Sequence, residues 1–374
     1  MSRTEDALIA IVGGGIAGLA LVRALRQHGL HANVFERRRS PSDGGLAINL
    51  PGNAVQALAA LGLGDAVAQQ GHAIRRREYR TERDTLLFEI DEEEFWGTEA
   101  CPRSIRRSVL MKLLRHDVGH LLHDDVDVRS VMLHPDRVDL QCSDGKAFCS
   151  HLVVGADGVR SIVRDGMLGV EKGTSYSILA RASWRFMVPN PGIDCWTVWV
   201  GPRGMILLLP VSDAEVYGWA AVTHQSAQDS PAALELLSRA FPDRVRKAVA
   251  AALSLPAAIH HSPLEEVRLR TWTRGRAVLM GDAAHACAPV WAQGGALALE
   301  DGIVLAECLA AGQPLPVALG AYELRRRPRV QHVQAMTDAM SKAAKLPTIV
   351  RNLLMPFMGP KRYRQTYSPL RALP

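Results

Sequence analysis

Three glycines near the start of the chain are spaced to hold a ligand that carries a pyrophosphate. Gly13, Gly15 and Gly18 follow the apolar run 8–12 in the pattern GxGxxG. In this pattern the first glycine permits a tight turn, the second lets the backbone approach the phosphates, and the third allows the following helix to pack on the strand. The phosphates then lie at the positive end of that helix. The loop therefore predicts a dinucleotide site.

An acidic residue at the end of the next predicted strand strengthens this interpretation. Glu36 lies 18 residues beyond Gly18, at a position where a carboxylate accepts hydrogen bonds from the ribose hydroxyls of an adenosine. A carboxylate there also disfavours the 2′-phosphate of NADP, which leaves FAD or NAD as the ligand. We expect Arg37, together with Ile16 and Ala17 of the glycine loop, to contact the same dinucleotide.

Two later segments each run from a predicted buried strand into a short motif that contains aspartate and glycine. One buried apolar stretch runs into Asp157-Gly158, and another runs into Gly281-Asp282, with Pro289 a few residues later. Together with the N-terminal glycines they resemble, in the same order, the three motifs of the class A, single-component aromatic hydroxylase family of FAD-dependent monooxygenases. The resemblance covers nearly the whole chain. It implies a fold similar to that of p-hydroxybenzoate hydroxylase, bound FAD, and NADH or NADPH as a transient co-substrate.

The resemblance also implies roles for individual residues. Arg107, at a predicted helix start, matches an arginine that contacts the flavin, and Asp157 matches a residue near the phosphates of FAD and the nicotinamide cofactor; the alternative for Asp157 is a turn residue. Asp282 is expected to accept hydrogen bonds from the ribitol chain. Gly294 and Gly295 open a helix whose amides and positive end suit the negative charge of a reduced flavin. The full set of expected cofactor contacts is Gly13, Gly15, Ile16, Ala17, Gly18, Glu36, Arg37, Arg107, Val131, Asp157, Gly281, Asp282, Pro289, Gly294, Gly295 and Ala296.

Two residues depart from the family pattern at this helix start. Ala292 stands where members commonly have the first glycine of Gly-Gln-Gly, and Ala296 stands where they commonly have asparagine. The acidic pair Glu300-Asp301 that usually follows is present. Loss of the asparagine puts a side-chain contact in doubt, whereas the backbone amides remain. His285 matches a structural residue of the motif, so we assign no catalytic side chain.

Candidate substrate contacts come from two predicted strands in the middle of the chain. Alternation in the first strand places Arg181 and Arg185 on one face, which can meet an anionic substrate. Tyr217 and Trp219 share a face of the second strand and can stack on an aromatic ring. Solvated arginines and core aromatic residues remain the alternative interpretation of all four.

The elements that position these residues alternate between strands and helices in the first part of the chain. Residues 8–12, 16–27 and 32–36 are predicted as strand, helix and strand, which implies a parallel sheet with a crossover helix. From about Ser175 alternating strands indicate an antiparallel sheet. Further predicted elements are helices at 54–61, 109–122, 232–255, 295–311 and 319–344, the last interrupted at Pro328, and strands at 126–131, 137–142, 152–155, 177–187, 197–200, 205–210, 216–223 and 277–280.

This order of elements predicts an α/β fold in three parts. The first is a Rossmann-like FAD-binding domain with a parallel sheet, the second an inserted antiparallel-sheet substrate domain, and the third a set of C-terminal helices. The predicted boundaries are 1–75, 100–174 and 269–345 for the discontinuous FAD-binding domain, 76–99 and 175–268 for the substrate-binding domain, and 346–374 for a C-terminal helical tail.

Composition argues against several other classes of protein. The formal net charge of +6 over 374 residues is spread in short arginine clusters, without the basic stripe or motif that nucleic-acid binding requires. The six cysteines form no CxxC pair and no Cys/His cluster at zinc spacing, which predicts no metal site and buried thiols in a reducing compartment. We therefore expect a cytoplasmic monomer or homodimer that acts on a small molecule.

The resemblance implies a reaction cycle. NAD(P)H reduces FAD, the reduced flavin captures O₂ as a C4a-hydroperoxide, and the distal oxygen is transferred to an electron-rich aromatic or polycyclic substrate, in secondary metabolism or aromatic catabolism. Epoxidation, Baeyer-Villiger insertion, prenyl reduction and non-catalytic ligand binding remain open. A flavin-dependent halogenase shares the N-terminal motif, but Trp196 and Trp199 are not in the Trp-x-Trp arrangement of tryptophan halogenases.

The C-terminal tail has an unusual mixture of residues. The apolar run 353–358 lies among the basic residues Arg351, Lys361, Arg362 and Arg364. One interpretation is that the tail docks on a lipid surface or reaches a lipophilic substrate. The other is that it forms a helix that covers the core.

Overall fold

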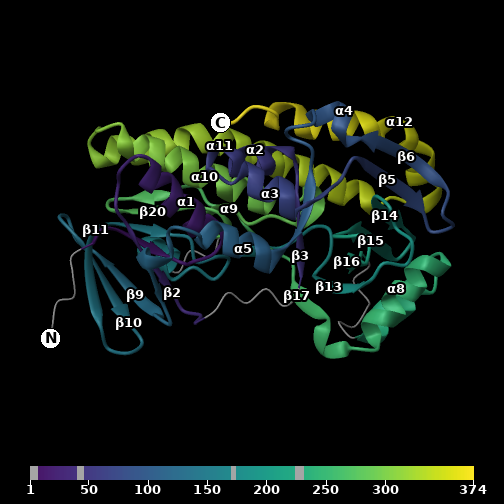
Figure 1. The fold of residues 1–374 in the computed structure, drawn as a ribbon, viewed down its shortest axis with the longest axis horizontal. Coiled ribbons are helices and arrows are strands. Elements are labelled where there is room, and N and C mark those ends of the chain that lie inside the picture. The colour runs from purple at the N-terminus through teal and green to yellow at the C-terminus, as the bar shows by residue number, and fades with distance from the viewer. Residues whose placement is uncertain (1–6, 40–45, 170–173, 224–230) are drawn as a thin grey trace.

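Two sheets lie end to end along the molecule, with long C-terminal helices across both (Figure 1). The structure is a computed structural model and describes residues 7–39, 46–169, 174–223 and 231–374. The parts of the predicted domain ranges that fall on residues 1–6, 40–45, 170–173 and 224–230 lie outside the described residues. The mixed α/β architecture confirms the predicted fold class.

The first sheet has a parallel centre, as the sequence predicts. Its order is β19-β20-β11-β1-β2-β8, and the strands from β20 to β8 run parallel. Because the carboxyl ends of parallel strands meet at one edge, the loops after β1, β2, β11 and β20 gather there. The strands are β1 (Ala7–Val12), β2 (Asn33–Glu36), β8 (Leu122–Asp124), β11 (Ala147–Gly155), β20 (Ala277–Leu279) and β19 (Thr273–Arg274), with the antiparallel β9 (Val128–Leu133) and β10 (Val138–Cys142) added beside β11.

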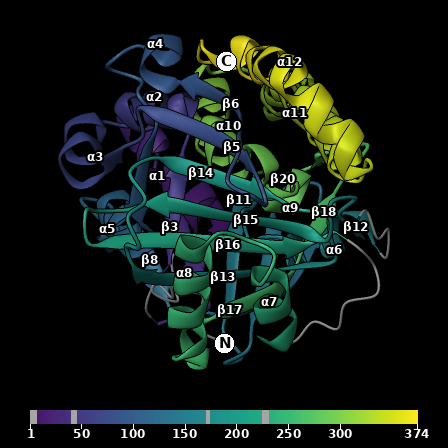
Figure 2. The ribbon, with the colours of Figure 1, turned by 90° about the vertical axis from the view of Figure 1, so that its right-hand side faces the viewer.

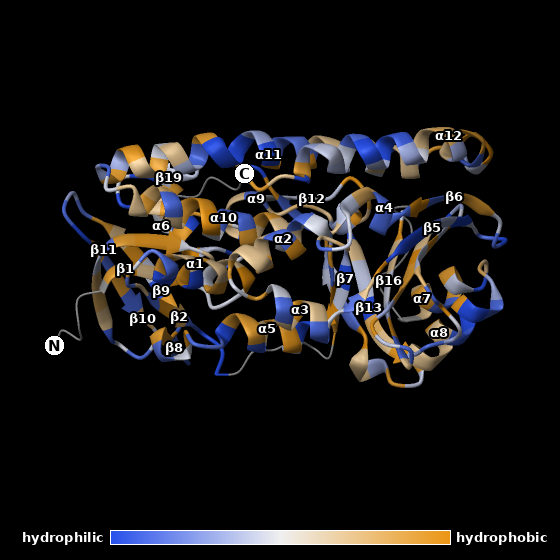
Figure 3. Ribbon diagram, turned by 45° about the horizontal axis from the view of Figure 1, so that its top comes forward, coloured by the Kyte–Doolittle hydropathy of each residue, from blue (hydrophilic) through white to orange (hydrophobic). Residues whose placement is uncertain are grey.

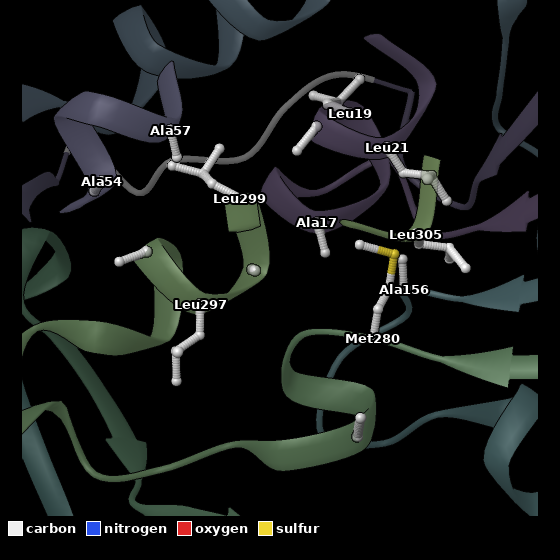
Figure 4. Close-up of a cluster of buried hydrophobic side chains, with 14 of the residues drawn as sticks. Ala17, Leu19, Leu21, Ala54, Ala57, Ala156, Met280, Leu297, Leu299 and Leu305 are labelled. Atoms are coloured by element: carbon white, nitrogen blue, oxygen red, sulfur yellow. The ribbon is translucent and has the colours of Figure 1, made fainter. Parts of the chain in front are cut away.

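The core of this part lies where α1 (Ile16–Gln27) crosses α10 (Gln293–Ala310). A Cβ at Gly302 of α10 would meet the backbone of Ala20 and Leu21, so the two helices approach closely because that residue is glycine. Burial of each leucine here contributes about 1.5–3 kcal/mol. The crossing thereby fixes the start of α1 relative to the start of α10. Buried side chains around it include Ala17, Leu19, Leu21, Ala54, Ala57, Ala156, Met280, Leu297, Leu299 and Leu305 (Figure 4).

The second sheet has seven strands and an antiparallel centre. Its order is β17-β13-β16-β15-β14-β5-β6. The early hairpin β5–β6 joins it through a parallel pairing with β14. The first strand of the predicted antiparallel unit begins at Ala182, later than the predicted residue 177. The strands are β5 (Arg76–Thr81), β6 (Leu86–Asp91), β13 (Ala182–Pro189), β14 (Trp196–Val200), β15 (Gly204–Pro210), β16 (Glu215–Val222) and β17 (His260–Pro263).

Helices α7 (Pro231–Ser238) and α8 (Asp243–Leu253) cover the outer face of this sheet (Figure 2). The sequence predicts one helix over residues 232–255. Two helices form instead, because Pro242 is the N-cap of α8 and the residue before a proline is restricted to extended conformations. The opposite face of the sheet points toward the interior of the molecule.

Short elements connect the two sheets. Helix α5 (Arg107–Arg115) ends earlier than the predicted 109–122, because Asp117 adopts a left-handed conformation with φ of 64°. The other strands are β3 (Ala47–Leu50), β4 (His72–Ala73), β7 (Arg103–Arg106), β12 (Thr174–Tyr176) and β18 (Glu265–Val267), and the other helical segments are α2 (Gly52–Ala60), α3 (Gly64–Gln70), α4 (Glu92–Trp96), η1 (Gly119–Leu121), α6 (Ile162–Leu168), η2 (Pro256–Ala258), α9 (Asp282–His285) and η3 (Pro289–Trp291).

Two long helices, α11 (Leu315–Ala344) and α12 (Thr348–Tyr367), run across the molecule, and η4 (Ser368–Leu370) follows them (Figure 3). The predicted interruption at Pro328 is wrong, since α11 continues through it. The proline leaves the carbonyl of Leu324 without its helical partner, and Leu324 lies on an exposed turn where water can bind that carbonyl. Among the described residues, no helix has the length and apolar character needed to cross a bilayer.

Candidate functional site

A cavity of about 670 Å³ extends from the carboxyl edge of the parallel sheet to the inner face of the antiparallel sheet. Cavities of this size hold small-molecule ligands and cofactors. The cavity also reaches residues near the end of α11 and in the first half of α12. Its lining includes these predicted site residues: Gly13, Gly15, Ile16, Ala17, Glu36, Arg37, Arg107, Asp157, Arg185, Tyr217, Trp219, Asp282, Pro289, Gly294 and Gly295.

The three spaced glycines of the first loop have separate structural roles. Gly13 has a φ of 108° and touches the backbone of Ala156, so it forms the turn between β1 and the loop after β11. A Cβ at Gly18 would overlap the carbonyl oxygen of Gly13, so this position sets the distance between helix and turn. A Cβ at Gly15 would have no neighbour within 4 Å, which leaves the backbone open to the cavity. These are the roles that the GxGxxG spacing predicts.

Glu36 closes this loop at the end of β2. Its Oε2 accepts the amide hydrogen of Gly14 at 2.7 Å, and its Oε1 accepts that of Arg38 at 3.0 Å. Each oxygen keeps a second lone pair, and the residue lines the cavity. The carboxylate can therefore bind a ribose hydroxyl while it holds the loop in place.

Asp157 binds the backbone at the start of α6 and also lines the cavity. Its Oδ2 accepts the amide hydrogens of Ile162 at 2.7 Å and Val163 at 3.3 Å, at the start of α6. Its Oδ1 is buried without a hydrogen-bond partner. Burial raises the pKa of this carboxyl group above its ordinary value. The residue therefore holds the start of α6 through one oxygen, while its other oxygen is buried beside the cavity.

Asp282 presents its carboxylate directly to the cavity. It is the first residue of α9, lines the cavity and has exposed surface in the structure without ligand. Burial raises its pKa, and the positive charges of Arg107 and Arg185 act in the opposite direction. A Cβ at Gly294 would lie 3.8 Å from Oδ1 of Asp282. The start of α10 and this carboxylate therefore border the same space.

These features fit FAD. The glycine loop and Glu36 leave backbone and carboxylate groups open to the cavity that could hold an adenosine diphosphate, and Asp282 offers an acceptor that a ribitol chain could use. Gly294 and Gly295 at the start of α10 line the cavity and carry no side chains of their own. Backbone amides at a helix start favour negative charge. The cavity continues past this point and so has room for a second molecule.

A buried polar network holds the start of α10. Asn53 of α2 exchanges two 3.0 Å hydrogen bonds with Gln293 and donates a third, at 2.8 Å, to Glu300. Glu300 and Asp301 both bind Arg326, at 2.9 and 2.7 Å, and all three side chains are fully buried. Sequence reasoning noted the acidic pair and the arginine cluster separately but missed this connection. The network lies behind the lining and positions it.

The far end of the cavity is aromatic and apolar. Tyr217 and Trp219 of β16 face it together with Trp196, as does Arg185 of β13. Burial raises the pKa of Tyr217 to about 12, so its hydroxyl keeps its proton. The indole nitrogens of Trp196 and Trp219 are buried without a hydrogen-bond partner. Further apolar lining comes from Leu179, Val198, Val200, Met205, Leu207, Leu264, Val290, Met340 and Met355.

Two predicted contacts lie on the wrong side of their elements to line the cavity. Val131 is buried on β9 against Gly166, and the lining in this region comes instead from residues 126–128. Arg181 is exposed just before β13, because the strand starts one residue later than the predicted alternation requires. Of the two predicted arginines, Arg185 alone lines the cavity.

Three further residues that were predicted to contact the cofactor, Gly18, Gly281 and Ala296, support the residues that line the cavity. Gly18 spaces helix and turn as described above. Gly281 adopts a φ of 56° and packs against Ala17, so it shapes the turn that presents Asp282. Ala296 is buried in the core, with 1% of its surface exposed. These residues lie beneath the lining and are not among the residues that border the cavity.

Comparison with known proteins agrees with this geometry. The FAD binding domain family matches residues 6–337. Aurachin C monooxygenase/isomerase from Stigmatella aurantiaca is 33% identical over 335 residues, covering 85% of this chain and 84% of that protein. The 3-amino-4-hydroxybenzoate 2-monooxygenase PtnB3 from Streptomyces platensis is 30% identical over 365 residues, covering 92% and 90%. The structure of Klebsiella pneumoniae HpxO complexed with FAD and uric acid has the same fold, with a TM-score of 0.86 at 23% identity and coverage of 98% of this chain and 97% of that chain.

The matched region contains every cofactor loop described above, from Gly13 to the start of α10. The residues present at those loops fit FAD, and the relatives carry the same reaction type in their names. The chain therefore belongs to the FAD binding domain family and is a flavoprotein monooxygenase of the single-component aromatic hydroxylase type.

Proposed function

We propose that the protein uses NADH or NADPH and O₂ to hydroxylate an electron-rich aromatic small molecule with a largely apolar body. The observation that carries this proposal is the continuity of one cavity, with a dinucleotide cradle at one end and an aromatic, apolar wall at the other. FAD, when bound, supplies the transfer of electrons from the nicotinamide to O₂ and of one oxygen atom to the substrate.

The chain's own residues would bind and orient the substrate. Trp219 and Trp196 offer aromatic surfaces and indole N–H donors that lack protein partners. Tyr217 stays protonated and can donate to a substrate oxygen, and Arg185 favours negative charge on that oxygen. A phenol-like ring, which becomes more electron-rich as it loses its proton, meets both requirements. The apolar lining limits water around the reacting atoms.

The substrates of the relatives support a ring-containing substrate. Their names describe action on aurachin C and on 3-amino-4-hydroxybenzoate. Arg77, Arg185 and Arg351 line the far end among many apolar side chains. Arg77 is paired with Glu92 and Arg351 binds backbone carbonyls, so the remaining wall is mainly apolar, which favours a less polar ring than an aminohydroxybenzoate. We assign residues 76–99 and 175–268 to substrate binding, residues 1–75, 100–174 and 269–345 to FAD binding, and residues 346–374 to a C-terminal helical tail.

The location and assembly of the protein are proposed from the state of its cysteines and from the lining of its cavity. All six cysteines are free thiols, which supports a reducing compartment such as the cytoplasm. We propose a monomer or homodimer there; the described residues of one chain supply the lining of the cavity.

The test is turnover by the purified, flavin-loaded protein. NADH and NADPH oxidation and O₂ uptake are measured across phenols, quinolones and polycyclic aromatics, with products analysed by mass after reaction under ¹⁸O₂. We expect one compound to accelerate NAD(P)H oxidation and to gain one labelled oxygen atom. Flavin reduction by NAD(P)H without any labelled product, across ligands that bind the cavity tightly, would contradict the proposal and favour a reductase or a ligand-binding protein.

A further inference from the structure

The outer face of α12 carries a row of exposed apolar side chains. Ile349, Leu353 and Phe357 are 84%, 70% and 79% exposed. They recur every four residues, so they form one stripe along the helix. Val350, Leu354 and Met358 follow the same spacing beside them and are also exposed. In Figure 3 the first half of α12 is coloured mainly as hydrophobic and lies at the outside of the molecule.

The opposite face of the same helix is anchored in the protein. Arg351 donates hydrogen bonds of 3.1 Å to the carbonyl oxygens of Val200 and Gly201. Tyr363 donates to the buried Glu92, and Tyr367 donates to the carbonyl of Trp291 at 2.7 Å. The buried positions lie roughly opposite the apolar stripe on the helical circle. The helix therefore cannot turn its exposed apolar face inward without breaking these contacts.

Within the chain segment that carries the stripe, the charged residues have one sign, whereas β6, which packs against α12, carries the exposed acidic residues Glu89 and Asp91. Residues 339–374 contain seven lysines and arginines and no aspartate or glutamate. Lys342 and Lys345 are exposed before the stripe, and Lys361 and Arg364 are exposed after it. An apolar face flanked by cations matches the headgroup and acyl boundary of a membrane that contains anionic lipids. A second copy of the chain would bring the same positive charges against each other.

The cavity lies directly inside this helix pair. Its lining includes Arg351 and Met355 of α12 and Met340, Ala343 and Ala344 of α11. The helix that presents an apolar face outward thus borders the apolar end of the cavity on its other side. A surface that holds lipid at this place would bring a lipophilic molecule close to the substrate space.

We propose that the outer face of α12 docks on an anionic lipid surface. The face consists of Ile349, Val350, Leu353, Leu354, Phe357 and Met358, with Lys342, Lys345, Lys361 and Arg364 as its charged border. The apolar side chains insert at the interface and the cations meet the lipid phosphates. The docking is peripheral and reversible, because the inner side of the helix stays bound to the protein.

The test is sedimentation of the full-length protein with vesicles of phosphatidylcholine alone or with 30% phosphatidylglycerol. We expect binding to the anionic vesicles that weakens at 0.5 M NaCl, and at least a tenfold loss of binding in the Leu353→Ser/Phe357→Ser variant. Lys361→Gln/Arg364→Gln should bind more weakly to anionic vesicles only. Leu324→Ser is the matched control, because Leu324 is 77% exposed on α11, outside the face.

Flavin content and thermal unfolding show whether each variant is folded. Outward-facing substitutions should leave both unchanged. Absence of binding by the wild-type protein to either vesicle, or equal binding by the Leu353→Ser/Phe357→Ser variant, overturns the proposal. So does a concentration-dependent dimer that these two substitutions dissociate in the absence of vesicle binding, since the face would then join two copies of the chain.

Discussion

Nε2 of His285 lies 2.6 Å from Oδ2 of Asp301, and both side chains are buried. The same oxygen accepts the amide hydrogen of Gly281 at 2.8 Å, and Oδ1 of Asp301 accepts a hydrogen bond from Arg326 at 2.7 Å. Asp301 therefore ties the turn that presents Asp282 to two long helices. The cavity keeps its shape through a carboxylate that lies outside its lining.

The first prediction concerns the pH dependence of this contact. Burial alone would raise the pKa of Asp301, but His285 and Arg326 lower it to about 2, below the 3.8 of an unperturbed aspartate. The ionised carboxylate therefore contributes stability above about pH 4, which is lost as the pH falls toward 2. The contribution is about 2 kcal/mol. Urea unfolding of the wild type and Asp301→Asn at pH 7, 4 and 3 measures it, and a difference between the two proteins that is the same at all three values would contradict it.

Arg326→Met should destabilise the protein strongly. The substitution leaves Glu300 and Asp301 buried with less positive charge, at a cost of about 3–5 kcal/mol. Arg325→Met is the control, since its partner Glu307 is about as exposed as Arg325 itself, and such surface pairs contribute about 0–1 kcal/mol. Urea unfolding at pH 7 compares the two variants. Equal losses would mean that the buried network does not hold α10.

Gly15→Val and Asp282→Ala should each weaken FAD retention. The valine side chain would occupy the open space in front of the loop, and the alanine removes the acceptor that faces the cavity. The flavin-to-protein absorbance ratio after purification and a titration with FAD measure the effect, expected to be at least tenfold in the dissociation constant. Gly320→Val, on the exposed surface of α11, is the control. Full flavin content in both site variants is the result that rejects the placement.

Ala292→Gly should stabilise the protein or leave it unchanged, although glycine usually destabilises. Ala292 precedes α10 with φ of 53°, a left-handed conformation that costs an alanine about 1 kcal/mol relative to glycine. Ala311→Gly, at the other end of the same helix with φ of −68°, should lose about 0.5–1 kcal/mol. Thermal unfolding of the two variants side by side checks the difference in sign.

Arg185→Met should raise the KM for a substrate with an anionic or phenolic oxygen by about 10-fold or more, which corresponds to roughly 1.4 kcal/mol or more. Arg181→Met should change it little, because that side chain lies outside the cavity lining. Steady-state kinetics with the compound that stimulates NAD(P)H oxidation gives both values. A larger effect from Arg181 than from Arg185 would reverse the assignment of the binding face.

Local features of the chain were predictable because local chemistry determines them. The glycine loop between an apolar run and a periodic helix predicted α1 with its observed bounds, Ile16–Gln27. The parallel strands appeared as short apolar runs because both of their faces are buried. Arg181 shows the limit of such patterns, since β13 begins at Ala182 and the predicted alternation does not apply to a residue before the strand.

Features that join distant parts of the chain could not be predicted in the same way. Asn53 and Gln293 are 240 residues apart in the sequence, and no spacing in either segment indicates the other. The hairpin β5–β6 joins β14 through a pairing that skips about a hundred residues. Pro328 favoured a break that did not occur, because the freed carbonyl faces solvent.

Helix α11 links the two ends of the site. Its 30 residues extend about 45 Å at 1.5 Å per residue. Arg326 near its middle holds the flavin end through Asp301, and Met340 near its end borders the aromatic end. Pro328 lies between these two points and removes one internal hydrogen bond. Because Pro328 lies between Arg326 and Met340, bending of α11 at this residue would change the distance between the two points at which the helix meets the ends of the cavity.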